Sequence, residues 1–241
     1  MKSKGCQYSY GIIPIQRWKT EILSFDPYIA LFYDFVTEKE SNLIIGKASL
    51  KLEKALTGPD PRDFVLNTEQ RLSKASWFED ASPSVFRRIS HRIEQVTGLK
   101  AGYRAERSFG EAYQVVNYGI GGFYTPHYDF FKIDKAFKTA GNYLQDSGDR
   151  AATFMVYLGN VTSGGATVFP RLGIGTPPIK NAALFWNNFA PENGLRDERT
   201  LHGGCPVISG HKWVTNKWIH EISTAMIRSC RKESSVKENA S

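Results

Sequence analysis

The chain has 241 residues, of which 41% are hydrophobic, and this is enough to bury one sizeable core. Lysine and arginine outnumber aspartate and glutamate by 31 to 24, but the basic residues are spread along the chain, so binding to nucleic acid is not indicated. The apolar runs are all well short of the ~20 residues needed to span a bilayer, so membrane insertion is not expected.

The first regular elements should follow an apolar and aromatic run. Residues Tyr28–Val36 have the composition of an early strand. The next four residues, from Thr37 to Glu40, have the Thr-x-x-Glu spacing of a capping box. We therefore expect a helix that begins there and continues to about Leu56.

A second helix is predicted further along the chain. Ser82 and Pro83 are an N-cap residue followed by proline at the first helical position, and Gly98 stands where a glycine commonly ends a helix. Apolar residues recur between them at helical spacing. Together the two helices, over about 37–98, should buttress a sheet.

From residue 113 onward the pattern changes to short strand-like runs separated by Gly, Asn and Pro. The runs are Tyr113–Tyr118, Tyr124–Phe130, Ala151–Leu158, Ala166–Phe169, Ala182–Trp186 and Lys212–Ile222. Helices followed by such strands predict an α+β, mainly β fold, in which N-terminal helices buttress a double-stranded β-helix (jelly roll) over about 113–222. We expect one domain over 1–228 and a disordered tail over 229–241, which is rich in Ser, Lys and Glu.

One short motif indicates a metal site. His127 and Asp129 are two residues apart, so on a strand both side chains would leave the same face and could grip one ion. Two imidazoles and one carboxylate define the non-haem Fe(II) oxygenase site, which leaves positions open for an oxo-acid and dioxygen. His91 lies in the second predicted helix and is expected to be a surface or packing residue. Three candidates remain for the second histidine: His202, His211 and His220.

The last predicted strand carries a lysine that could belong to the same site. Alternation places Lys212 and His220 on one face of this strand and Trp213 on the other. An inward lysine would need an anionic partner, because an unpaired buried ammonium costs several kcal/mol, and the carboxylate of an oxo-acid would supply one. Alternation alone leaves open the reverse arrangement, with Lys212 in solvent and Trp213 in the core.

Longer segments resemble a known family. The segments are Tyr118–Asp129 (YGIGGFYTPHYD), Gly164–Pro170 (GGATVFP), His202–Trp213 (HGGCPVISGHKW) and Arg71–Trp77 (RLSKASW). They closely resemble the catalytic domain of collagen prolyl 4-hydroxylase α subunits, which are Fe(II)- and 2-oxoglutarate-dependent dioxygenases, and the resemblance extends from about Cys6 to Cys230. It implies hydroxylation of peptidyl proline to 4-hydroxyproline, coupled to decarboxylation of 2-oxoglutarate to succinate and CO2. It also implies that Fe(II), 2-oxoglutarate, O2 and L-ascorbate are required.

Matched position by position, the resemblance implies roles for individual residues. The metal ligands would be His127, Asp129 and His202. The 2-oxoglutarate-binding residues would be Lys212, Tyr118 and Thr167. The residues on the peptide-facing side would be Tyr124, Arg150, Trp218 and His220, for which ordinary packing is the alternative interpretation.

The resemblance also bears on partners and compartment. It implies a proline-rich, collagen-like peptide substrate and protein disulfide isomerase as β subunit, in the lumen of the endoplasmic reticulum. The first residues lack the apolar stretch of a secretory signal, however, so the sequence leaves the compartment open. Cys205 and Cys230 match a disulfide-bonded pair of the family, whereas Cys6 is expected to be a free thiol because its family partner would lie upstream.

Two other functions are consistent with the same residues. The family's upstream dimerisation and peptide-binding regions are not in this sequence, so a truncated form or non-catalytic paralogue that binds proline-rich peptide or a partner subunit is the first. A zinc hydrolase is the second, since zinc also accepts His and Asp ligands. That function would give Lys212 no role.

Overall fold

The structure is a computed structural model that describes residues 4–11, 17–58, 65–81, 84–104, 107–131, 147–190 and 193–225. Within these ranges, no helix combines the length and apolar character needed to cross a membrane. Three predictions fall outside them: the N-cap at Ser82 and Pro83, the disordered tail, and the Cys230 half of the disulfide.

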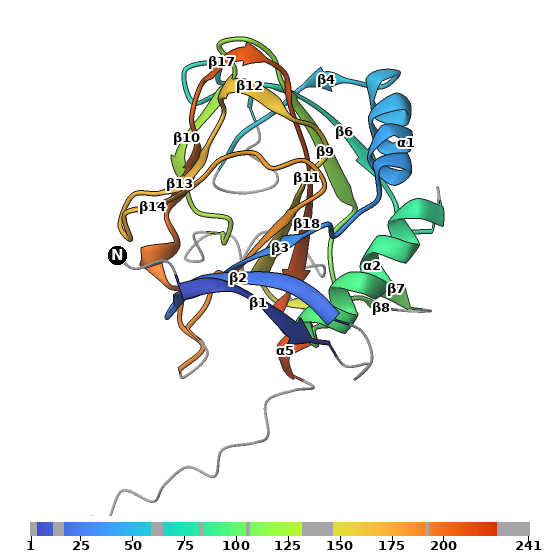
Figure 1. The fold of residues 1–241 in the computed structure, drawn as a ribbon, viewed down its shortest axis with the longest axis vertical. Helices are drawn as coiled ribbons and strands as arrows, with labels where there is room; N and C mark the ends of the chain where they lie inside the picture. The colour runs from blue at the N-terminus through green and yellow to red at the C-terminus, as the bar shows by residue number, and fades with distance from the viewer. Residues whose placement is uncertain are drawn as a thin grey trace, which may run out of the picture.

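A nine-stranded antiparallel sheet forms the larger layer (Figure 1). Its strands lie side by side in the order β1 (Lys4–Tyr10), β2 (Arg17–Phe25), β3 (Tyr28–Tyr33), β15 (Ala183–Asn187), β11 (Arg150–Tyr157), β18 (Lys212–His220), β9 (Tyr113–Tyr118), β6 (Lys74–Phe78) and β4 (Glu53–Lys54). Strand β11 is buried along its whole length, as expected for a strand that is covered on both faces.

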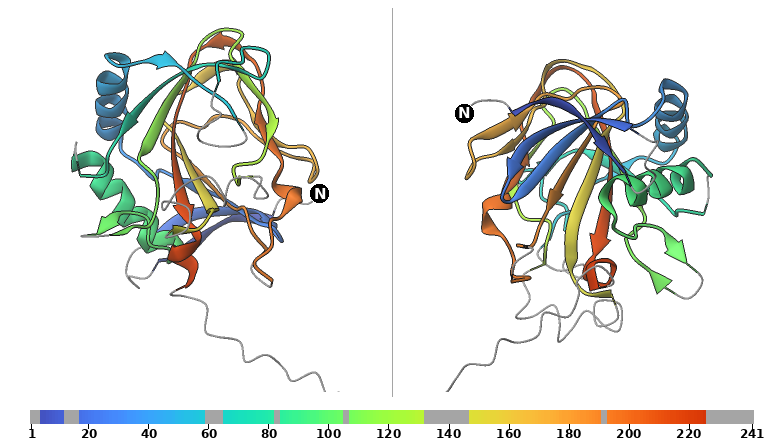
Figure 2. Two further views of the ribbon diagram at one scale, coloured as in Figure 1. Left: turned by 180° about the vertical axis from the view of Figure 1, so that it is seen from behind. Right: turned by 60° about the horizontal axis from the view of Figure 1, so that its bottom comes forward.

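A five-stranded sheet forms the smaller layer, and Figure 2 shows it facing the larger sheet. Its order is β14 (Ile174–Thr176), β13 (Thr167–Phe169), β16 (His202–Gly204), β10 (Phe123–His127) and β5 (Arg71–Leu72). Two further pairs are β12 (Val161–Gly164) with β17 (Val207–Gly210), and β7 (Tyr103–Arg104) with β8 (Arg107–Ser108). The fold is thus mainly β and has the jelly-roll arrangement that was predicted.

The larger sheet separates two apolar clusters. On its outer face, helices α1 (Glu38–Ser49) and α2 (Ser84–Thr97) pack through residues such as Ile44 and Phe86 onto Phe154. On its inner face, toward the smaller sheet, Tyr157 and Trp186 pack with Phe169. The helices therefore buttress one face, and the other face is left to line an interior between the sheets.

Local signals placed the start of α1 and the end of α2. Thr37 Oγ1 accepts the Glu40 N–H at 3.2 Å while Glu40 Oε2 accepts the Thr37 N–H at 3.0 Å, which confirms the capping box. Gly98 has φ of +76°, the left-handed conformation that ends a helix at glycine. The prediction that the first helix reaches Leu56 was wrong, because β4 leaves the helix direction to pair with β6.

The six strand-like runs all contain strands; β9 has the predicted ends, and the ends of the other five are shifted. Strand β10 ends at His127, earlier than predicted, and β18 ends at His220 because a short helix, α5 (Glu221–Ala225), takes over. The remaining element is the 3-10 turn η1 (Glu198–Thr200). The other described strands had not been predicted: β1, β2, β4 to β8, β12, β14, β16 and β17.

Candidate active site

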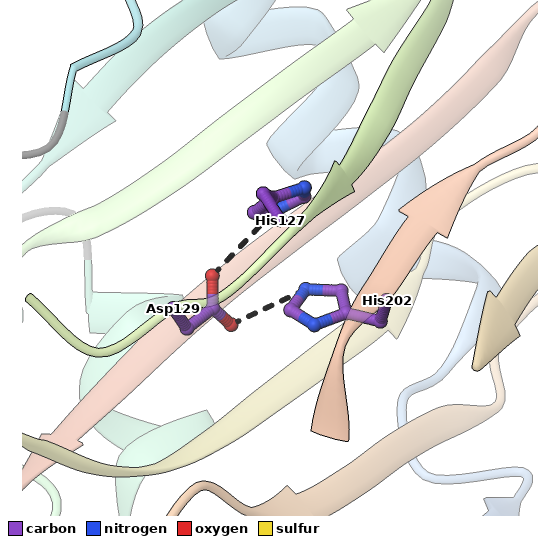
Figure 3. Close-up of side chains that lie close together, drawn as sticks. All are labelled: His127, Asp129 and His202. Atoms are coloured by element: carbon purple, nitrogen blue, oxygen red, sulfur yellow. Dashed lines mark ion pairs between the residues drawn. The ribbon is translucent and has the colours of Figure 1, made fainter. Parts of the chain in front are cut away.

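Three potential metal ligands converge between the two sheets (Figure 3). His127 and His202 are direct partners in the pairing of β10 with β16, so their side chains project into the same interior. Asp129 Oδ1 lies 3.7 Å from His127 Nε2, and Asp129 Oδ2 lies 3.6 Å from His202 Nε2. One donor atom from each residue lies within 4.8 Å of the others, a spacing that can surround one ion.

Asp129 reaches this position differently from the way predicted. It lies two residues beyond the end of β10, so strand alternation does not direct its side chain. Instead, Thr153 Oγ1 on β11 donates a hydrogen bond to Asp129 Oδ2 at 2.6 Å, and Asn188 Nδ2 donates to Thr153 Oγ1 at 3.0 Å. The carboxylate is thus oriented by the larger sheet.

Both imidazoles are held with one nitrogen toward the centre of the site. His127 Nδ1 lies 2.9 Å from the Thr125 carbonyl oxygen, and His202 Nδ1 lies 3.0 Å from the Thr200 carbonyl oxygen. A carbonyl only accepts, so each Nδ1 must carry a proton, and each Nε2 is the nitrogen left to bind a metal ion. Backbone partners of this kind orient metal-binding histidines.

The electrostatics suit a divalent cation. Burial, followed by the neighbouring His202, lowers the pKa of His127 to about 3, so this imidazole is neutral at pH 7. Burial alone would raise the pKa of Asp129, but His202, His127 and Arg150 lower it, so the carboxylate is ionised. Two imidazole nitrogens and one carboxylate form the facial donor set of non-haem Fe(II) oxygenases.

The support for Asp129 can be tested without removing a ligand. Thr153→Val keeps the shape of the side chain but removes the hydroxyl that binds Asp129 Oδ2. Loss of such a partner typically weakens metal binding ~10–100-fold. We expect a loss in this range when Mn(II) or Co(II) binding is titrated calorimetrically. Wild-type metal affinity in Thr153→Val would show that the contact does not orient Asp129.

A cavity of about 460 Å³ extends from the three ligands to Lys212. Tyr118 and Thr167 also line it. Lys212 is only 3% exposed, and its Nζ donates to Thr167 Oγ1 at 3.1 Å. No aspartate or glutamate in the described part of the chain pairs with this ammonium. The structure therefore decides between the two orientations left open above: Lys212 faces inward, and Trp213 packs on the helix side.

The four residues expected on the peptide-facing side fall into two groups. Tyr124, Arg150 and Trp218 line the cavity. The Tyr124 ring stacks on His127, with 3.5 Å between ring centroids, and the Arg150 guanidinium lies 3.9 Å from the centroid of the Trp218 ring. His220 does not line the cavity; it is fully buried, and its Nδ1 lies 3.0 Å from Ser147 Oγ.

Two residues that no sequence motif indicated support this wall. Glu111 binds Arg150 through both carboxylate oxygens, with Oε2 2.7 Å from Nη2, and it lies 3.2 Å from His220 Nε2. Burial would raise the pKa of Glu111, but Arg150 lowers it to about 2. Arg71 lies over the other aromatic side chain, 4.7 Å from the Tyr124 ring centroid. Neither residue belongs to a motif, although Arg71 lies in a segment that carries the resemblance.

One cysteine of the expected disulfide, Cys205, lies next to this region. Cys205 directly follows β16 and is half-buried. Its expected partner, Cys230, is outside the described residues, and the side chain of Cys6 is also outside them. The pairing of Cys205 with Cys230 and the free thiol at Cys6 stay predictions.

Comparison with known proteins identifies the family. Residues 113–220, which include all three potential ligands and Lys212, match the model of the 2OG-Fe(II) oxygenase superfamily. Residues 113–220 therefore form a domain of this superfamily. The donor set and the buried lysine of this 2OG-Fe(II) oxygenase thus lie in the segment that defines the family, and Fe(II), 2-oxoglutarate and O2 are its cofactor and cosubstrates.

Curated relatives of this oxygenase are subunits of larger enzymes. It is 39% identical to human prolyl 4-hydroxylase subunit alpha-3 over 228 residues, covering 93% of this chain and 40% of the relative. It is 40% identical to prolyl 4-hydroxylase subunit alpha-2 of Caenorhabditis elegans, covering 92% of this chain and 39% of the relative. The chain therefore spans about two-fifths of the relatives it matches.

Solved structures share the fold. A viral collagen prolyl hydroxylase from Paramecium bursaria Chlorella virus 1, in complex with 2-oxoglutarate, is 26% identical, with a TM-score of 0.61 over 82% of this chain and 98% of that chain. A Trichoplax adhaerens prolyl hydroxylase in complex with a hypoxia-inducible-factor peptide is 15% identical, with a TM-score of 0.53 over 83% and 87% of the two chains. At that identity the second comparison supports the fold alone.

Proposed function

We propose that this oxygenase hydroxylates peptidyl proline to 4-hydroxyproline, with conversion of 2-oxoglutarate to succinate and CO2. The observation that carries the proposal is one cavity in which a His-Asp-His donor set faces a buried lysine that has no carboxylate partner among the described residues. The donor set suits Fe(II), and the lysine suits the far carboxylate of 2-oxoglutarate. The names of the relatives support proline as the target.

Different residues of the cavity would bind Fe(II) and 2-oxoglutarate. His127, Asp129 and His202 would hold Fe(II), which when bound supplies open coordination positions and activates dioxygen. Lys212 would bind the distal carboxylate of 2-oxoglutarate. Thr167 Oγ1 accepts a hydrogen bond from the Lys212 ammonium and would orient this ammonium toward the carboxylate. Tyr118 closes the same end, since its ring centroid lies 5.6 Å from Lys212 Nζ.

The peptide would enter on the side of the aromatic residues. Tyr124 and Trp218 present rings to the cavity, and the Arg150 guanidinium lies over the Trp218 ring. Aromatic walls suit proline-rich segments. Such segments already adopt the extended polyproline II helix, so they lose little conformational entropy on binding. His220 would act indirectly, by supporting Glu111.

Protonation of Lys212 makes a prediction about pH. Burial is the largest cause that lowers the pKa of Lys212 to about 8, and Cys205 opposes it. The ammonium form binds a carboxylate, so affinity for 2-oxoglutarate should be constant well below this pKa and fall about tenfold per pH unit well above it. Titrations from pH 6.5 to 9.5, followed by the quenching of tryptophan fluorescence, would measure this. Lys212→Arg should remove the fall, because arginine stays protonated.

The proposal extends to the substrate and the setting. A collagen-like substrate is supported by the name of the viral neighbour, and L-ascorbate, protein disulfide isomerase as partner and the endoplasmic reticulum are proposed on the resemblance to α subunits. A zinc hydrolase would leave Lys212 buried without a function, which disfavours it.

The decisive experiment is a hydroxylation assay with proline-containing peptides. The chain is incubated with Fe(II), ascorbate, 2-oxoglutarate and (Pro-Pro-Gly)n or alanine-substituted controls, and mass spectrometry measures the addition of one oxygen atom while succinate is quantified. Oxygen on proline, with an equal amount of succinate, is expected. Saturable peptide binding without succinate would instead indicate the non-catalytic peptide-binding form.

A further inference from the structure

A buried ion pair lies behind the cavity wall, on the opposite face of β18. Lys217 alternates with the cavity-lining Trp218 and is 1% exposed. Its Nζ donates to Asp80 Oδ1 at 2.6 Å and lies 4.7 Å from the centroid of the Tyr113 ring. Asp80 is 6% exposed, so both charges are removed from solvent. None of the functions considered so far uses this pair.

The same ammonium also holds the backbone of Glu111. Lys217 Nζ donates to the Glu111 carbonyl oxygen, and the Glu111 N–H donates to the Trp218 carbonyl at 3.0 Å. At Gly110 the approach to β18 is so close that a Cβ would lie 2.6 Å from the Trp218 carbonyl oxygen. Two hydrogen bonds therefore hold the Glu111 backbone against β18: one from its own N–H to Trp218, and one from the Lys217 side chain to its carbonyl oxygen.

Through its carboxylate, Glu111 also contacts Arg150, which lines the cavity. Its carboxylate binds the Arg150 guanidinium through both oxygens. Arg150 in turn lies on the Trp218 ring and donates from Nη1 to the Asp129 carbonyl oxygen at 3.3 Å. A continuous set of contacts thus runs from Asp80 on the helix side to the wall that faces the metal ligands.

Stability alone gives no reason for charges at this place. Well-packed apolar residues of similar volume often stabilise a protein as much as a buried ion pair does, or more. An apolar side chain, however, could not donate to the Glu111 carbonyl. We propose that Lys217 and Asp80 are positioning residues that fix Glu111 and thereby orient Arg150 for binding peptide. The peptide role of Arg150 rests on the proposed function; its placement over Trp218 does not.

Two variants separate positioning from stability. Lys217→Met leaves Asp80 buried without the ammonium, so Tm should fall by roughly 10 °C. Lys217→Met with Asp80→Leu removes both charges, so Tm should return toward that of the wild type. The KM for peptide should stay raised on the order of tenfold in both variants, while the KM for 2-oxoglutarate stays within about twofold, because Lys212 is untouched. Recovery of the peptide KM in the double variant would overturn the proposal.

A second measurement needs no substrate. The chain has five tryptophans, and Trp218→Phe assigns the Trp218 indole N–H signal in a 15N-labelled sample. This signal should shift in the double variant, because Arg150 is no longer held over the ring, and an unshifted signal would overturn the proposal. If the wild type hydroxylates no proline peptide, the proposed function fails, yet this measurement still decides whether the pair places Arg150.

A matched control lies in the helical layer. Arg92 on α2 pairs with Glu40 on α1, with the two side chains 19% and 10% exposed. Arg92→Met removes one cation from a partly buried pair, as Lys217→Met does. It should lower Tm and leave the peptide KM and the Trp218 signal unchanged.

Discussion

Replacing His202 with alanine should abolish iron-dependent succinate formation. His202 Nε2 is one of only three nitrogen or oxygen donors in the proposed ligand set, and its orientation is fixed by the Thr200 carbonyl. Loss of a ligand should weaken metal binding by more than the ~10–100-fold that follows loss of a supporting residue. Calorimetric titration with Mn(II) measures the affinity, and quantified succinate measures turnover.

A matched substitution tests whether the effect is local. His91 lies on α2 with its side chain 63% exposed, far from β16 in the fold, and His91→Ala should leave both metal affinity and succinate formation at wild-type levels. Thermal unfolding of the two variants would show that neither loses its fold. Wild-type activity in His202→Ala would refute the ligand assignment.

The second large effect should come from replacing Lys212 with methionine. Removing one member of a buried, hydrogen-bonded charge pair costs about 2–5 kcal/mol. The apparent Kd for 2-oxoglutarate should therefore rise between ~30-fold and several thousand-fold. Metal affinity without 2-oxoglutarate should change little, since Lys212 is not among the three ligands. Titrations of 2-oxoglutarate and of Mn(II) separate the two quantities.

Although it weakens binding of 2-oxoglutarate, the Lys212→Met substitution should not destabilise the fold. Without 2-oxoglutarate, the Lys212 ammonium is buried and has no carboxylate partner among the described residues, so methionine should leave the free energy of unfolding unchanged or raise it by ~1 kcal/mol. Excess 2-oxoglutarate should raise the Tm of the wild type but not of Lys212→Met. Lys180→Met, at an exposed pair with Glu38, is the control and should respond to 2-oxoglutarate as the wild type does. Wild-type saturation by 2-oxoglutarate in Lys212→Met would exclude Lys212 as its anchor.

Local patterns succeeded where the controlling forces are local. The capping box at Thr37 and the glycine at 98 depend on hydrogen bonds and dihedral angles within one helix turn, so the sequence contains all that is needed. Strand β2 shows a local signal that was passed over: Trp18 and Thr20 are buried while Arg17 and Lys19 are exposed. This alternation is weak because the strand lies near the sheet edge and carries many polar residues.

In the candidate site, too, the features that depend on local sequence were predicted, and those that depend on distant strands were not. Residue types and spacings, with the family resemblance, were sufficient to name the three potential ligands and Lys212, which the structure brings to one cavity. They could not place Asp129, which is turned inward by Thr153 from another strand, or reveal Glu111, whose partner Arg150 comes from a distant strand. From periodicity alone, even the inward orientation of Lys212 stayed open.

The physical reason is the range of the interactions involved. Hydrogen bonds within a turn and alternation along a strand are encoded by neighbours in the chain. The order of amino acids was therefore enough for the start of α1, the end of α2, seven of the described strands and the list of potential donors. Distances across the cavity depend on register between strands far apart in the chain, such as the pairing of His127 with His202. Only the folded sheets decide which side chains meet there, because packing and pairing of both layers set these distances together.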